Sequence, residues 1–290
     1  MKLAREEEMP DVLKRVPAER ERWQSRALVW VVGTLLAVAA VAPVVVDFHG
    51  WRGLRVVALP FLLSAMFALL VWALRAATGA AAVMGFFVCF ILAGRPVVSS
   101  AVSGRIVFHP AIAALVAVFV LTYVATRFGR ARKAARGLAE ARKGLRAASQ
   151  IVANLGVAAL AAAVGSYAGC IAALAETAAD TVSSEIGQAV GGPAWLITSW
   201  RRVSPGTDGG VSLVGTVAGV LAALVIVGFG GLHHALWPEG LVVFVAACAG
   251  LVFDSLLGAT VERRGWVGND WVNFASTLFA AAVAGVLGRW

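Results

Sequence analysis

Charged residues are scarce in this sequence. Lys, Arg, Asp and Glu make up 14% of its 290 residues, whereas a typical soluble domain carries about 25%. Hydrophobic residues make up 60% of the chain. This composition excludes an ordinary soluble domain and predicts an integral membrane protein. The net charge of +9 does not indicate a nucleic-acid partner, because Lys and Arg in a membrane protein mostly record its orientation.

Several familiar motifs are also absent. The three cysteines, Cys89, Cys170 and Cys248, stand singly in apolar runs without CxxC or Cys/His spacing. They are therefore expected to be reduced packing residues. The P-loop pattern GxxxxGK[ST] does not occur, which argues against a P-loop nucleotide site. The first apolar run is too long for the core of a cleavable signal peptide.

The sequence contains instead a series of apolar segments, most of them close to the roughly 20 residues that span a bilayer. Residues 150–188 are too long for one span at 1.5 Å per residue, so we expect two helices with a break near Gly165–Gly169. The other segments lie at about 27–46, 54–74, 79–95, 107–126, 210–231, 239–259 and 271–288. We therefore predict an all-α, polytopic membrane helix bundle with about nine transmembrane segments.

The distribution of Lys and Arg orients this bundle. With nine spans and a cytosolic N-terminus, most Lys and Arg residues fall on the cytosolic side, as the positive-inside rule requires. The predicted parts are a charged cytosolic segment (1–26), two N-terminal membrane helices (27–74) and a core membrane domain with cytosolic loops (75–290). The expected location is the cell membrane of a bacterium or archaeon.

A polar stretch, AETAADTVSSEIG (175–187), interrupts the apolar pattern. Glu176 and Asp180 are four residues apart and share a helix face, with Glu185 following. A carboxylate at the centre of a membrane helix costs roughly 2.5–3.5 kcal/mol, so we expect these residues to bind an ion or take part in chemistry. Oxygen ligands of this kind suit Mg²⁺. The alternative is a polar packing network or pairing with arginine.

A glycine-rich loop follows an arginine pair and opens an apolar helix. Such a loop offers backbone N–H groups to an anion, and the arginines can clamp phosphate oxygens. The alternative is a turn with a topology-setting arginine pair and Asp208 as a helix cap. Gly215 and Gly219, four residues apart, are more typical of helix packing. Asp208 is also a candidate metal ligand, together with Asp180, Glu185 and Asp254. The candidate cofactor-binding residues of this loop are Arg201, Arg202, Gly206, Thr207, Asp208, Gly209 and Gly210.

A third polar block spans Phe253–Phe274. Asp254 lies inside an apolar run, and because no helix cap explains it we expect it to be functional. Asn269 and Asn273 share a face at the start of the last helix, where Asp270 is placed to act as a cap.

The basic run at 127–146 is either a topology anchor or a surface that recruits an anionic substrate. Its candidate residues are Lys133, Arg142, Lys143 and Arg146. Asn154 lies just inside the following span and is placed to reach the same site.

Three ordered blocks, ALAETAADTVSSEIG, RRVSPGTDGGVSLVGTVAG and DSLLGATVERRGWVGNDWVNF, resemble a membrane family long catalogued as a domain of unknown function. That family includes the phytyl-phosphate kinase of the vitamin E pathway. The resemblance covers roughly residues 75–288. The first block is also similar, more weakly, to the polar helix of the CTP-using dolichol kinases and phosphatidate cytidylyltransferases.

The resemblance implies phosphoryl transfer from a nucleoside triphosphate, with CTP expected, to an isoprenoid monophosphate at the membrane. It matches Asp180, Glu185, Asp208 and Asp254 as the acidic residues, with Asn269 and Asn273. We expect Asp180 and Asp254 to coordinate Mg²⁺ on the nucleotide phosphates, with Glu185 nearby. The alternatives are a cytidylyltransferase that makes a CDP-lipid, and a secondary transporter in which the two aspartates bind ions or protons.

Overall fold

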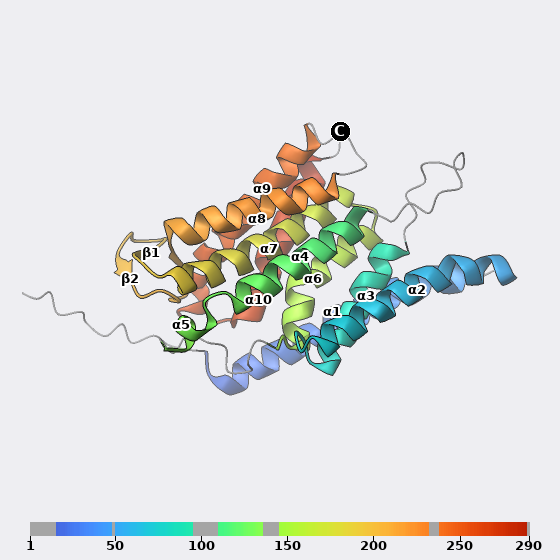
Figure 1. Ribbon diagram of the computed structural model, residues 1–290, viewed down its shortest axis with the longest axis horizontal. Coiled ribbons are helices and arrows are strands. Elements are labelled where there is room, and N and C mark those ends of the chain that lie inside the picture. Colours follow the sequence, from blue (N-terminus) through green and yellow to red (C-terminus); the bar gives the residue numbers. More distant parts are fainter. Residues whose placement is uncertain (1–15, 48–49, 95–109, 136–144, 232–237, 289–290) are drawn as a thin grey trace, which may run out of the picture.

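The computed structural model describes residues 16–47, 50–94, 110–135, 145–231 and 238–288, which are mainly helical (Figure 1). The helices are α1 (Ala18–Asp47), α2 (Gly50–Ala73), α3 (Gly79–Ala93), α4 (Pro110–Arg127), α5 (Arg130–Ala135), α6 (Ala148–Ala163), α7 (Tyr167–Val190), α8 (Leu213–Gly230), α9 (Glu239–Leu257), the π-helical η1 (Gly258–Glu262) and α10 (Asn269–Leu287). The helical bundle predicted from the sequence is confirmed.

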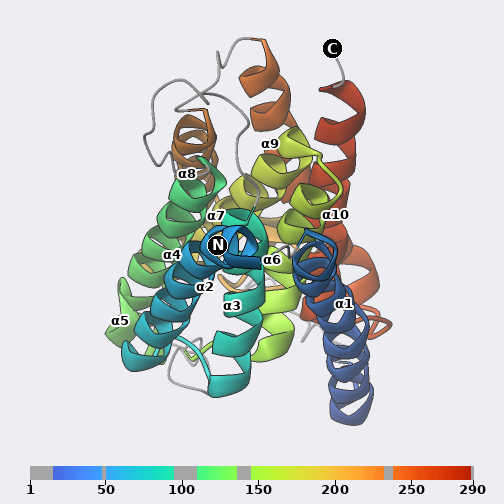
Figure 2. The same cartoon turned by 90° about the vertical axis from the view of Figure 1, so that its right-hand side faces the viewer.

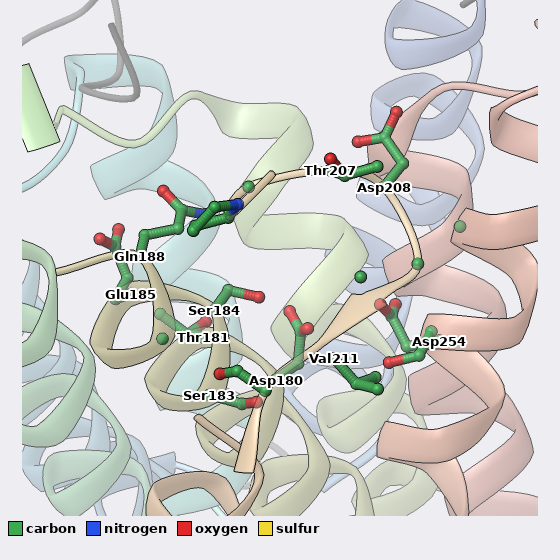
Figure 3. Close-up of a pocket in the computed structure, with 18 of the residues that line it drawn as sticks. Asp180, Thr181, Ser183, Ser184, Glu185, Gln188, Thr207, Asp208, Val211 and Asp254 are labelled. Atoms are coloured by element: carbon green, nitrogen blue, oxygen red, sulfur yellow. The ribbon is translucent and has the colours of Figure 1, made fainter. Parts of the chain in front are cut away.

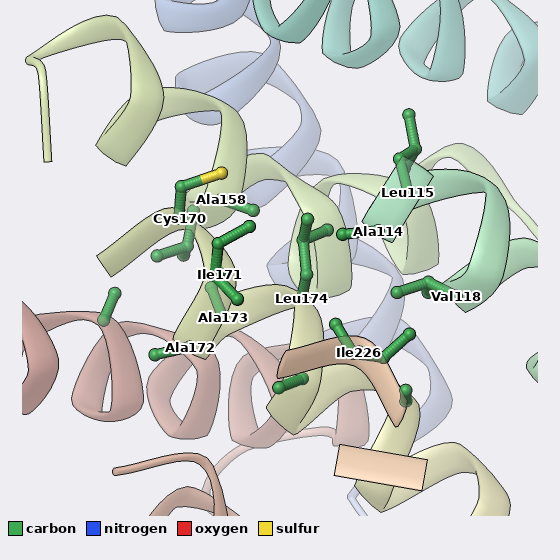
Figure 4. Close-up of a cluster of buried hydrophobic side chains, with 14 of the residues drawn as sticks. Ala114, Leu115, Val118, Ala158, Cys170, Ile171, Ala172, Ala173, Leu174 and Ile226 are labelled. Atoms are coloured by element: carbon green, nitrogen blue, oxygen red, sulfur yellow. The ribbon is translucent and has the colours of Figure 1, made fainter. Parts of the chain in front are cut away.

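Helix α7 forms the centre of the bundle. It contacts α4, α6, α8, α9 and α10, and these helices surround it in Figure 2. Ile171 and Leu174 of α7 are buried together with Leu115 of α4 and Ile226 of α8 (Figure 4). The helix that carries the polar stretch is thus enclosed by apolar neighbours along its first half.

Two glycines of α8 allow this helix to pack tightly against α7. A Cβ atom on Gly215 would lie 2.6 Å from the carbonyl oxygen of Ser183, and one on Gly219 would lie 2.6 Å from that of Ala179. Any larger residue would force the helices apart, as in other small-residue helix contacts. The interpretation of Gly215 and Gly219 as packing residues is confirmed.

The helices follow the predicted apolar segments closely. Among the described residues, four helices are long and apolar enough to cross a membrane: α1, α8, α9 with η1, and α10. Shorter apolar helices occur in α2, α3, α4 and α6. The predicted division of residues 150–188 is confirmed, because α6 ends at Ala163 and α7 begins at Tyr167. The total of nine membrane crossings stays a prediction.

A small antiparallel sheet was not predicted. Its strands are β1 (Ala194–Leu196), β2 (Arg202–Val203) and β3 (Gly210–Val211), in the order β2-β1-β3. The sheet lies between α7 and α8 in the chain, at the left-hand end of Figure 1. Strands of two or three residues are too short to show an alternating pattern, so their sequence resembles a loop.

The first turns of α1 hold the connection between η1 and α10. The Gln24 side chain donates to the carbonyl oxygen of Trp266 (2.9 Å) and accepts from the N–H of Gly268 (2.9 Å). The backbone carbonyl oxygen of Gln24 accepts from the indole N–H of Trp271 (3.1 Å), and the Ser25 hydroxyl donates to the Asp270 carboxylate (2.6 Å). The N-terminal part of α1 therefore fixes the position of the segment that leads from η1 into α10.

Replacing Gln24 with alanine is expected to destabilise the protein. The substitution removes two side-chain hydrogen bonds, each contributing about 0.5–1.5 kcal/mol. The expected result is a lower melting temperature of the purified protein in detergent. Arg22→Ala, at an exposed position of the same helix, is the control. Equal melting temperatures for the two variants would show that this contact contributes no stability.

Candidate functional site

A cavity of about 340 Å³ opens at the C-terminal half of α7, bounded by the glycine-rich loop, α9 with η1, and the first turns of α6 and α10 (Figure 3). Most of the predicted site residues line it. They are Lys133, Arg146, Asn154, Asp180, Glu185, Gly206, Thr207, Asp208, Gly209, Gly210, Asp254, Asn269 and Asn273. Residues spread over 140 positions of the chain are thus brought to one cavity, which we call the polar pocket.

Asp180 of α7 and Asp254 of α9 come together in the polar pocket. Their carboxyl groups lie within hydrogen-bonding reach of each other, and Asp180 also contacts Ser184. The Ser276 hydroxyl donates to Asp254 from α10 at 3.1 Å. Both aspartates are partly exposed to the pocket. Two adjacent carboxylates repel each other unless a proton or a cation is shared, so this pair offers a place for positive charge.

The donor set is compatible with a magnesium ion that arrives with a nucleotide. Within the described ranges, no group of three or more His, Cys, Asp or Glu side chains is arranged to hold a metal ion. Mg²⁺ is usually bound by only one or two carboxylates together with substrate phosphates. Asp180 and Asp254 fit that requirement, whereas a protein-only metal site would need more ligands.

Glu185 and Lys133 form an ion pair at the edge of the pocket. The Lys133 ammonium contacts the Glu185 carboxylate and donates to the carbonyl oxygen of Thr126 at 2.9 Å. The Lys133 side chain is only 3% exposed and that of Glu185 15%. Both residues were predicted to bind phosphate or metal independently, and in the structure they neutralise each other.

The glycine-rich loop is fastened against the end of α9. Gly206 and Gly209 have positive φ angles of 85° and 71°. A Cβ atom on Gly209 would lie 2.3 Å from the backbone nitrogen of Ala259. Only glycine permits both this backbone conformation and this approach. The loop therefore takes its position beside Asp254 from a direct backbone contact with η1.

Asn154 and Asn273 link α6 to α10 beneath the carboxylates. The Asn273 amide donates to the Asn154 side-chain oxygen at 3.3 Å, and Asn154 donates to the Gln150 carbonyl oxygen at 2.8 Å. The Thr177 hydroxyl donates to the Asn154 carbonyl oxygen. Both asparagines are buried. Their contacts hold α6, α7 and α10 in register, while Asn269 is exposed at the start of α10.

The arginine pair does not reach the polar pocket. Arg201 and Arg202 are exposed, and Arg202 lies on the edge strand β2 opposite Trp195. Arg142 and Lys143 lie outside the described residues. The structure adds two basic lining residues that we did not predict, Arg127 and Arg130. The basic run was the available signal for them, but it does not reveal which of its residues face the cavity.

Comparison with known proteins identifies the family. The sequence profile of the family described as integral membrane protein DUF92 matches residues 62–281. The chain belongs to this family. The resemblance stated from the three polar blocks is thereby confirmed, and the match includes every described residue that lines the polar pocket.

Curated relatives of this DUF92 protein occur in several kingdoms. An uncharacterized membrane protein of Synechocystis is 33% identical over 59% of this chain and 70% of its own length. An uncharacterized membrane protein of Methanocaldococcus jannaschii is 33% identical over 60% and 73%. The chloroplast protein VTE6 of Arabidopsis thaliana is 31% identical over 58% of this chain and 55% of VTE6. No solved structure matches the chain.

Replacing Gly209 with alanine is expected to displace the loop from η1. Gly165→Ala is a matched control, because Gly165 also has a positive φ of 83° but open space around its Cβ position. Backbone strain at such a φ amounts to about 1–3 kcal/mol and is common to both variants. We expect a lower melting temperature for Gly209→Ala, and faster trypsin cleavage at the exposed Arg201 and Arg202. Equal behaviour of both variants would contradict the contact with Ala259.

The ion pair predicts non-additive substitutions. Lys133→Met or Glu185→Gln leaves one charge unpaired, and removing one partner of a buried pair typically costs about 3–5 kcal/mol. The double variant is expected to be more stable than the sum of the single effects predicts. Melting temperatures of the four proteins test this, and strictly additive effects would contradict the pairing.

Proposed function

We propose that this protein is a membrane-embedded kinase. It transfers a phosphoryl group from a nucleoside triphosphate, with CTP as the expected donor, to an isoprenoid monophosphate such as phytyl or geranylgeranyl phosphate. The kinship with VTE6 and the family resemblance to phytyl-phosphate kinase support this proposal. The chain spans about half the length of VTE6, so the activity and its substrates are proposed for this protein.

The observation that carries the proposal is the distribution of charge in the polar pocket. Asp180 and Asp254 lie side by side, and Arg127, Arg130 and Arg146 line the same cavity. Phosphoryl transfer between two anionic phosphates needs this combination, because positioning and charge neutralisation supply most of the catalysis. The volume of about 340 Å³ lies within the usual range of small-molecule sites, about 300–1,000 Å³.

Each group of residues has a proposed task. Asp180 and Asp254 would hold Mg²⁺, which when bound neutralises the phosphate charge. Backbone N–H groups of residues 206–210 and the Thr207 hydroxyl bind nucleotide phosphates, and Asp208 is a further candidate ligand for the metal ion. Arg146, whose guanidinium donates to Thr181 at 3.4 Å, orients the acceptor phosphate beside the carboxylates. The acceptor is already anionic near neutral pH, so the reaction does not require a strong general base.

The ion pair between Lys133 and Glu185 has a positioning task in this scheme. It fixes α5 against the last turns of α7 and so shapes the rim of the pocket next to Arg130. We place this rim and the glycine-rich loop on the cytosolic side, where the nucleotide is available.

The proposed activity is tested with purified protein, CTP, Mg²⁺ and geranylgeranyl or phytyl monophosphate. The expected products are the isoprenoid diphosphate and CDP, with no product when EDTA removes the metal. Formation of a CDP-lipid and pyrophosphate would show a cytidylyltransferase instead. An intact protein that turns over no nucleotide with either acceptor would contradict both enzymes and favour transport.

Asp180→Asn is expected to lower kcat for diphosphate formation by roughly a hundredfold or more, the usual effect of removing one electrostatic contact to the transition state. Glu239→Gln is the control, because Glu239 is exposed at the opposite end of α9 and should leave kcat unchanged. Melting temperatures of both variants separate loss of activity from loss of folding. Full activity of Asp180→Asn would overturn its assignment.

A further inference from the structure

A second cavity, of about 70 Å³, adjoins the polar pocket and has an almost wholly apolar lining. It is bounded by α2, α3, α4 and α6, and we call it the apolar cavity. Five residues line both cavities: Thr126, Arg127, Arg146, Gln150 and Asn154. The two spaces therefore lie next to each other on either side of these shared residues.

One wall of the apolar cavity changes from aromatic to positively charged along α4. Phe67 of α2 packs edge-on against Phe119 of α4, with ring centroids 5.7 Å apart. Phe119 contacts Tyr123 (5.5 Å), and the Arg127 guanidinium lies 3.5 Å from the centre of the Tyr123 ring. Phe119, Tyr123 and Arg127 are four residues apart and share one face of α4. This face runs from hydrocarbon to a cation at the junction with the polar pocket.

Small residues keep the opposite wall open. Ala81, Ala82 and Gly85 of α3 line the cavity. Gly85 is buried, yet a Cβ atom added to it would meet no atom within 4 Å. A buried glycine with free space at its Cβ position marks room inside the protein, because interiors are otherwise closely packed.

Hydrogen bonds of Arg146 connect the walls of the two cavities. Its N–H donates to the carbonyl oxygen of Ala76 (2.9 Å) and its carbonyl oxygen accepts from the N–H of Thr78 (3.0 Å). Its guanidinium reaches across to Thr181 of α7. One residue is thus bound to the turn between α2 and α3 and to the helix that carries Asp180.

We infer that the apolar cavity receives the hydrocarbon chain of the isoprenoid phosphate next to its phosphate group. This inference rests on the proposed function. It identifies residues of α2, α3 and α4 as the ones that recognise the hydrocarbon chain of the substrate. An amphiphile with an anionic head and an apolar chain matches the polar pocket, the arginines at the junction and the apolar cavity in that order.

The size of the cavity limits how much of the chain it recognises. About 70 Å³ is less than the roughly 150 Å³ that holds one benzene molecule. Only the first few carbons of a long isoprenoid fit, and the remainder extends between helices into the bilayer. The site therefore selects for the shape of the chain near the phosphate more than for its total length.

The experiment uses Gly85→Leu, which fills the apolar cavity. Gly228→Leu is the matched control, because Gly228 of α8 also has no atom within 4 Å of its Cβ position but lies on an exposed face. We expect Gly85→Leu to raise KM for geranylgeranyl monophosphate at least tenfold and to leave KM for CTP unchanged. Gly228→Leu should change neither, and Gly85→Ala, for which there is room, should stay close to wild type.

A binding measurement makes the inference independent of activity, and its wild-type labelling pattern does not depend on any variant. Wild-type protein is irradiated with an isoprenoid monophosphate that carries a diazirine on the first isoprene unit, and labelled peptides are mapped by mass spectrometry. We expect labels on the walls formed by α2, α3 and α4, lost in Gly85→Leu and kept in Gly228→Leu. Labels elsewhere, or labels removed equally well by excess bilayer phospholipid, would overturn the inference.

The outcomes separate this inference from the proposed function. Labelling of the apolar cavity without diphosphate formation would leave the binding site standing and defeat the kinase. Diphosphate formation with an unchanged KM in folded Gly85→Leu, and labels outside the cavity, would defeat the binding site and leave the kinase standing.

Discussion

The cost of burying carboxylates in an apolar bundle governs how this protein is built. Glu176 is 1% exposed, and its Oε1 atom has no hydrogen-bond partner among the described residues. Burial of a carboxyl group without a full set of hydrogen-bond partners is costly, and it favours the neutral, protonated form over the charged one. Asp180, one turn further along α7, lies instead where the bundle opens, and Glu185 is neutralised by Lys133. Toward the C-terminus of α7, the carboxyl groups thus change from enclosed (Glu176) to lining the open pocket (Asp180) and then to paired with a cation (Glu185).

This arrangement requires one neighbouring helix to approach α7 closely while the other elements leave space beside Asp180. Gly215 and Gly219 bring α8 into backbone contact with α7 at Ser183 and Ala179, so α8 closes one side of α7 at the level of Asp180. Farther along, the glycine-rich loop is held outward on η1 by Gly209. The space left between these two glycine contacts is the polar pocket. Its walls are defined by backbone approach, which tolerates little variation in side-chain size.

The parts that were predictable from the sequence are those with a local signal. Asp180 and Asp254 stood out because a carboxylate within an apolar run is costly, and the break before Tyr167 followed from helix length. The pairing of Lys133 with Glu185, 52 residues away, has no such signal, because it depends on how α5 packs against α7. Arg201 and Arg202 lie just before the glycine-rich loop in sequence, but the short sheet places both of them on the exposed surface. The contact of Gln24 with Trp266 spans 242 positions and is likewise a product of packing.

Hydrogen bonds of Arg146 connect the turn between α2 and α3 to α7, the helix that carries Asp180. In the proposed kinase reaction, the lipid phosphate would have to present its head group to charged residues while its chain stays in surroundings that resemble hydrocarbon. The two environments have to be held at a fixed separation, since a misplacement of about 1 Å can reduce the rate of a positioned reaction a hundredfold. Backbone hydrogen bonds fasten Arg146 to the turn after α2, and its guanidinium reaches α7. A shift of α2 and α3 would therefore move the apolar cavity and a cation of the polar pocket together, which preserves their alignment.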